Sequence, residues 1–104
     1  MSTIAATFKG EPSITFRRGA KWNLAFSTVD FVADVADEDG ARVIVCRVSR
    51  EALEDRLRQS DESDPLDMFK LLKSDLRALA ENKLMAGDLE PDGSVLIRSL
   101  DLND

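Results

Sequence analysis

Hydrophobic and polar residues alternate most regularly in two segments, residues 29–35 and residues 41–48. Successive side chains of a strand point to opposite faces, so each segment predicts a strand with one apolar face. The apolar positions are odd in the first segment and even in the second: Val29, Phe31, Ala33 and Val35, then Ile44, Cys46 and Val48.

An Asp39-Gly40 pair joins the two segments and predicts a hairpin, for which two registers are compatible with the pattern. A two-residue type I′ turn at this pair places Val35 opposite Ile44, Ala33 opposite Cys46, Phe31 opposite Val48, and Asp37 across from Arg42. A four-residue turn over residues 37–40 keeps the same faces but pairs Asp30 with Arg47. We favour the first register, because Asp and Gly tolerate the positive φ that a type I′ turn requires.

A helical period of 3.6 residues replaces the alternation directly after the second segment. The Ser49 hydroxyl is suited to cap a helix start, and Ala52, Leu53 and Leu57 then fall on one stripe. The sequence therefore predicts a short helix that follows the hairpin without a linker.

A longer helix is predicted from Pro65 to Ala86. Asp64 is a suitable N-cap, Pro65 occupies the first helical position, and Gly87 stands where a C-cap residue is expected. The apolar stripe recurs at helical spacing: Leu66, Phe69, Leu72, Leu76, Leu79 and Ala80.

Weaker patterns predict three further strands. Ile14 and Phe16 suggest one, residues 22–26 a second after a turn at Gly19, and residues 94–99 a last one. We expect Phe16, Trp22, Phe26 and Phe31 to pack in the core against the long helix, and the tail after Ser99 to be loose.

These elements predict an α+β fold, an antiparallel sheet of about four strands packed against one short and one long helix. We expect residues 1–104 to form a single small domain, with residues 1–12 as a flexible N-terminal arm and residues 13–101 as the globular part.

The amino-acid composition limits the kinds of reaction and binding site that this chain can support. The 104 residues carry 20 acids against 14 bases, for a net charge of −6, with one cysteine and no histidine. Without histidine, Ser-His, Cys-His and His-metal chemistry are excluded, so we expect no enzyme activity, no catalytic residue, no metal site and no cofactor. One cysteine, no apolar run long enough for a membrane span and no signal-peptide pattern predict a cytoplasmic protein.

The remaining candidate groups have structural explanations. Cys46 shares its strand face with apolar residues, which favours an inert core thiol over a nucleophile. Asp30 and Asp34 share the opposite face with Arg47, which is a suitable ion-pair partner. Residues 34–40 do not fit an EF-hand calcium loop. If Gly40 is aligned with the glycine at loop position six, Val35 falls at position one and Cys46 at position twelve, where acidic ligands are required.

Charge is unevenly distributed along the chain. Residues 1–26 contain four bases against one acid, a balance of +3, so the remaining residues carry −9. Arg17, Arg18 and Lys21 lie beside Trp22 and form a candidate basic contact patch, either a solvated turn, a site for an acidic partner, or a nucleic-acid platform. The overall acidity disfavours nucleic acid and membranes as partners.

The second face of the hairpin is neither clearly polar nor clearly apolar. Val32, Val43 and Val45 lie on it together with Arg47. Either a helix covers this face, or these four residues form an interface for a homodimer or another protein.

The run from Gly40 to Asp55, GARVIVCRVSREALED, resembles a family of small bacterial proteins catalogued as domain of unknown function 1488. Supporting pieces are Ile14 and Phe16, the segment that begins at Trp22, and the closing DGSVLIRS. The resemblance spans residues 13–101. It implies one small domain in which an antiparallel sheet packs against helices, and no activity.

Together these observations suggest a non-catalytic protein-interaction or accessory domain, and they do not indicate the biological process in which it acts. A nucleic-acid-associated regulator that uses the basic turn and a small-molecule-binding domain with a pocket between sheet and helix are the alternatives.

Overall fold

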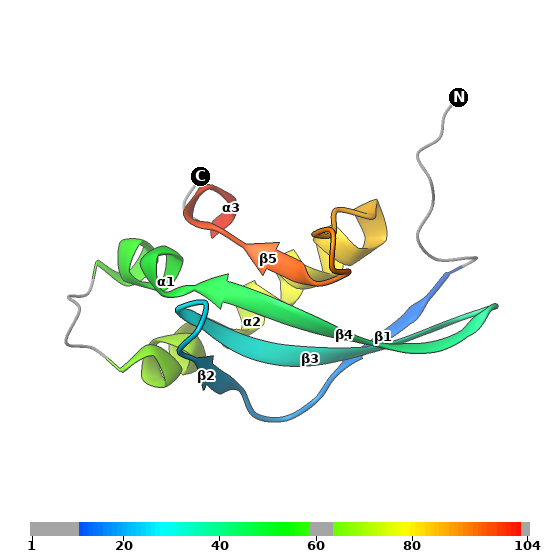
Figure 1. Cartoon of the computed structure of the whole chain (residues 1–104), viewed down its shortest axis with the longest axis horizontal. Helices are drawn as coiled ribbons and strands as arrows, with labels where there is room; N and C mark the ends of the chain where they lie inside the picture. The colour runs from blue at the N-terminus through cyan, green and yellow to red at the C-terminus, as the bar shows by residue number, and fades with distance from the viewer. Residues whose placement is uncertain (1–10, 59–63, 103–104) are drawn as a thin grey trace.

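The computed structural model describes residues 11–58 and 64–102. The predicted N-terminal arm, residues 1–12, therefore lies outside the described residues except at its last two positions. The fold is α+β, as predicted, with a mostly antiparallel sheet on one side of the long helix (Figure 1). In chain order the elements are β1 (Ser13–Phe16), β2 (Lys21–Asn23), β3 (Thr28–Asp37), β4 (Gly40–Ser49), α1 (Arg50–Leu57), α2 (Pro65–Ala86), β5 (Val95–Ile97) and α3 (Ser99–Leu102).

One edge of β3 is covered by two short strands that follow one another along it. β1 pairs with residues 33–36 and β2 with residues 28–30, both antiparallel. The connecting residues 17–20 lie opposite only two residues of β3, and the Arg17 N–H still donates to the Val32 carbonyl at 2.9 Å. β1 and β2 therefore form one interrupted edge of the sheet, and the second strand ends at Asn23 rather than at Phe26.

The favoured hairpin register is wrong, and the alternative is the one observed. Asp30 pairs with Arg47, and Val35 pairs with Arg42. Asp37 pairs with Gly40, so the turn comprises Glu38 and Asp39. Neither of these two residues has positive φ, whereas Gly40 has φ +129°, so the turn is not type I′.

The last strand differs in direction from the rest of the sheet. β5 pairs with β4 in parallel, with Val95 beside Cys46 and Ile97 beside Val48. A parallel neighbour requires a crossover connection, and α1 and α2 lie within it. The expected loose tail begins instead with a helical turn, α3, whose Leu102 is buried.

Both longer helices begin as predicted, and α2 also ends as predicted. The Ser49 hydroxyl accepts the N–H of Ala52 at 3.1 Å, and the Asp64 carboxylate accepts the N–H of Leu66 at 2.9 Å. Gly87 ends α2 with φ +71°, a conformation that glycine adopts without steric cost.

The core lies between α1 and α2 and the inner face of the sheet, which carries the predicted apolar positions of β3 and β4. The Phe31 ring lies 5.9 Å from that of Phe16 and 5.2 Å from that of Phe69. Trp22 packs partly buried against this core. The expectation for Phe26 is wrong: it belongs to the turn after β2 and is 62% exposed. Its place in the apolar alternation of residues 22–26 was misleading, because the strand ends before it.

Candidate interaction surface

The outer face of the sheet, which points away from α2, has three valines at its centre. Val32 on β3 pairs with Val45 on β4, so the two side chains lie side by side. Val43 stands one step further toward the hairpin turn and is 59% exposed. Figure 1 shows α2 behind the strands, and within residues 11–58 and 64–102 no helix crosses in front of them. The alternative that a helix covers this face is thus contradicted for the described chain.

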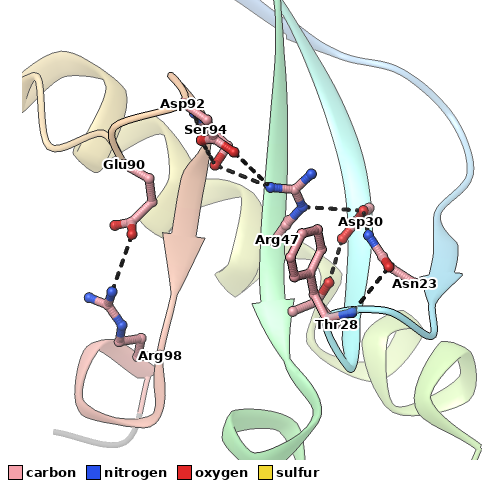
Figure 2. Close-up of polar contacts among 9 residues, drawn as sticks. Asn23, Thr28, Asp30, Arg47, Glu90, Asp92, Ser94 and Arg98 are labelled. Carbon is pink, nitrogen blue, oxygen red and sulfur yellow. Dashed lines mark hydrogen bonds and ion pairs between the residues drawn. The ribbon is translucent and has the colours of Figure 1, made fainter.

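Arg47 extends this surface as the centre of a polar network (Figure 2). Its Nε lies 3.4 Å from the Asp30 carboxylate, and its Nη1 lies 3.4 Å from both Asp92 and the Ser94 hydroxyl. Arg47 and Asp30 are only about one-fifth exposed, at 20% and 19%. Arg47 therefore ties β3, β4 and the loop before β5 together, and its charge is compensated within the chain.

Asp30 is held from three sides. Besides Arg47, the Thr28 hydroxyl donates to it at 2.7 Å and the Asn23 side-chain amide at 2.9 Å. The predicted Asp30–Arg47 pairing is thus present, and Asn23 brings the turn after β2 into the same network (Figure 2). Asp30 and Asp34 do not form a carboxylate pair, since each has its own arginine partner.

Two grooves open on the outer face, one on each side of the Arg47–Asp30 pair. The first, the β5 groove, has a volume of about 740 Å³. Its apolar walls come from Phe26, Leu96 and Leu100, and the Arg47 guanidinium lies 4.8 Å from the Phe26 ring. Arg98 stands at its rim in an ion pair with Glu90 at 3.3 Å (Figure 2).

The second, the β2 groove, has a volume of about 660 Å³ and lies between the interrupted edge and the outer face. Val32 and Val45 form its floor, and Leu24, which is 80% exposed, forms part of its wall. The three residues of the predicted basic patch also line it. The structure therefore brings the basic patch together in one groove with two of the four residues of the predicted interface, Val32 and Val45, whereas Val43 and Arg47 do not line this groove.

The three bases of that patch differ in their surroundings. Arg17 makes a bidentate ion pair with Asp34, with both nitrogen–oxygen distances 2.8 Å, although the two side chains are 54% and 43% exposed. These hydrogen bonds lower the pKa of Asp34 below its ordinary value. Arg18 and Lys21 are exposed, and neither has an ion-pair partner among residues 11–58 and 64–102.

Cys46 lies on the inner face, as predicted. It is fully buried, and its thiol donates weakly to the Ile44 carbonyl at 3.9 Å. Burial raises the pKa of the thiol to about 12, so the reactive thiolate is scarce near neutral pH.

We therefore expect Cys46 to react with an aromatic disulfide reagent only as fast as the folded chain opens. Labelling of the native protein at neutral pH, followed by absorbance, checks this expectation. The same chain in concentrated urea provides the control, in which one thiol per molecule reacts at once. Rapid labelling of the folded protein would contradict the inert-thiol interpretation.

Sequence patterns missed several residues that shape this surface. Phe26, Asp92, Ser94 and Leu96 belong to segments that approach Arg47 only through the fold. One signal was available for Leu96, since alternation within residues 95–97 places it opposite to its buried neighbours.

In the described part of the chain, no three histidine, cysteine or acidic side chains gather where they could hold a metal ion. None of the helices found there is long and apolar enough to cross a membrane.

Comparisons place the chain among known proteins. The sequence matches the family described as protein of unknown function, DUF1488, over residues 14–97. A protein of unknown function from the same family, from Shewanella loihica PV-4, has a crystal structure at 1.60 Å resolution. It resembles this chain with a TM-score of 0.73 and 21% identity, covering 82% of this chain and 91% of that one, which supports the common fold alone. No curated protein matches the sequence. With most of its length matched, this chain belongs to the DUF1488 family.

Proposed function

We propose that this chain is a cytoplasmic bacterial accessory domain that acts by binding another protein through the outer face of its sheet, without catalysis. The observation that carries the proposal is the uncovered apolar centre of that face, made by Val32, Val43 and Val45. Apolar surface gains free energy when it leaves water, at about 25 cal/mol per Å². Exposed apolar patches with a polar rim are typical of interaction sites.

The charged side chains around the three valines also support a binding role. Arg47, Asp30 and Asp34 are already engaged in ion pairs inside the chain, so a partner need not supply their counter-charges. Charged groups that lose water without a partner oppose association, whereas compensated ones do so less. The outer face therefore combines apolar surface with charged side chains that ion pairs within the chain hold in place and largely neutralise.

A non-catalytic role accords with the composition. The sequence contains no histidine, and its one cysteine is buried with a raised thiol pKa. The hydroxyl of Ser49, the last residue of β4, accepts the N–H of Ala52 as a helix cap. The described residues thus offer no activated nucleophile beside a base.

The double substitution Val43→Asp, Val45→Asp tests the proposal. We expect it to weaken partner binding at least about thirtyfold, because charges placed in the centre of an interface cost about 2 kcal/mol or more. The measurement is affinity purification of the tagged chain from its host, quantified by mass spectrometry, together with molar mass by light scattering. A homodimer through this face would appear as a loss of molar mass in the variant.

Leu71→Asp is the control, since Leu71 is an exposed apolar residue on α2, outside the outer face, with 73% of its surface in water against 59% for Val43. It should leave bound proteins and molar mass unchanged, and circular dichroism establishes that every variant folds. If the folded double variant kept the same partners and mass as the wild-type chain, the proposal would be wrong.

A further inference from the structure

The two grooves of the outer face differ in their free charge. In the β5 groove, both arginines are paired, Arg47 with Asp30 and Asp92, and Arg98 with Glu90. The β2 groove, in contrast, contains Arg18 and Lys21, for which the described residues provide no counter-charge. A ligand that brings negative charge would therefore gain more in the β2 groove.

The acids near the β2 groove do not cancel these two bases. Asp30 lines the groove, but its carboxylate accepts hydrogen bonds from Thr28 and Asn23 and pairs with Arg47. Asp34 is held by Arg17 in the bidentate pair. The rim formed by Arg18 and Lys21 thus keeps a net positive charge on a chain whose overall charge is −6.

The floor of the same groove is apolar. Val32 and Val45 lie there side by side, and Leu24 rises beside them with most of its side chain in water. Phosphate backbones gain little from such a floor, and two free bases are few for nucleic-acid binding. A peptide offers acidic and apolar side chains together. The volume of about 660 Å³ lies in the range of ligand clefts, about 300–1,000 Å³.

We propose that the β2 groove binds an acidic peptide segment of the partner protein, whose carboxylates pair with Arg18 and Lys21 while apolar side chains cover Val32, Val45 and Leu24. This inference rests on the proposed binding function and names the chemistry of the partner. The edge of β3 is already occupied by β1 and β2, so the segment lies across the outer face and does not add a strand to that edge.

Selection from a phage-displayed library of random dodecapeptides tests this inference, with the full chain as bait. We expect the peptides selected by the wild-type chain to be rich in Asp and Glu beside apolar residues. A bait with Arg18→Glu and Lys21→Glu should lose this preference. In fluorescence polarisation, its affinity for a selected peptide should fall about tenfold or more, because two exposed ion pairs become repulsive. The affinity of the wild-type chain should fall with added salt.

Arg56→Glu with Lys73→Glu is the matched control, because both bases are exposed on the helical side and the change in net charge is the same. This variant should keep the wild-type affinity. Val45→Asp should abolish binding of the selected peptides without changing the fold, as judged by circular dichroism.

The outcomes separate the two proposals. If peptides bind in a Val45-dependent manner but carry no acidic excess, the acidic-segment inference is overturned while the proposed binding function stands. If a fluorescent oligothymidylate binds in the Arg18- and Lys21-dependent manner and acidic peptides do not, the inference is overturned in favour of nucleic acid. If no peptide binds and the Val43→Asp, Val45→Asp chain keeps its cellular partners, both proposals fail.

Discussion

Phe31→Ala is expected to lower the free energy of unfolding by about 3–5 kcal/mol, a large fraction of the stability of a domain of this size. Phe31 is 2% exposed, and its ring contacts those of Phe16 and Phe69, so it joins the edge strand, the hairpin and the long helix. Removing the ring leaves a cavity among elements that come from three parts of the chain. Urea denaturation followed by circular dichroism measures the loss.

Phe26→Ala is the matched control for this experiment. The same side chain is removed, but Phe26 is largely exposed, and its ring lies 4.8 Å from the Arg47 guanidinium. A cation–π contact at an exposed site contributes about 0.5–1 kcal/mol, so the loss should stay near that value. Equal losses for the two variants would show that Phe31 is not the centre of the core.

Arg47→Met is expected to lower the free energy of unfolding by about 2–3 kcal/mol. The substitution keeps an unbranched stem but removes the counter-charge of Asp30, which is mostly buried, and the contacts to Asp92 and Ser94. Breaking a fully buried ion pair costs about 3–5 kcal/mol. The loss at Arg47 is smaller, because Thr28 and Asn23 still donate to Asp30. Urea denaturation gives the value.

Arg17→Met provides the comparison, because its ion pair is shorter and bidentate but about half exposed. Exposed ion pairs are screened by solvent and contribute little, so this variant should lose much less stability than Arg47→Met. The contrast decides whether burial or hydrogen-bond length governs the stabilisation by these two arginines. A larger loss for Arg17→Met than for Arg47→Met would contradict the role assigned to the buried network.

The helices could be predicted from the sequence because their end signals are local. Ser49, Asp64 and Gly87 act within one or two turns of their own positions, and each acts as expected. The alternation in residues 29–35 likewise predicted which side chains point to the inner and which to the outer face of the sheet. It could do so because successive side chains of a strand always point to opposite faces. These local features account for the correct fold class.

The hairpin register could not be predicted from the Asp39-Gly40 pair alone, because it is accompanied by a side-chain hydrogen bond within the turn. The Asp37 carboxylate accepts the N–H of Asp39 at 2.8 Å, so the turn begins one residue earlier than a type I′ turn at Asp39-Gly40 would. The observed register also sets Asp30 directly across from Arg47. The hydrogen bond from the Asp39 N–H to the Asp37 side chain thus favours the observed register over the other one with the same apolar faces.

The candidate site was predicted only in part. Strand parity brought Val32, Val43, Val45 and Arg47 onto one face, and charge pointed to the basic patch. The meeting of Val32 and Val45 with the basic patch in the β2 groove depends on how residues 17–20 pass the edge of β3, which no local pattern determines. The role of Arg47 depends on β5, whose loop meets it only through a long-range contact.

The parallel pairing of β5 with β4 has a consequence for folding during synthesis. The hairpin of β3 and β4 is local in sequence, and it is complete before either α2 or β5 has been made. The edge of β4 at Cys46 and Val48 is covered only when Val95 and Ile97 arrive after both longer helices. Contacts of such long sequence separation form slowly. A nascent chain that ends before Val95 therefore presents an unpaired strand edge, and the sheet is completed only after β5 has been made.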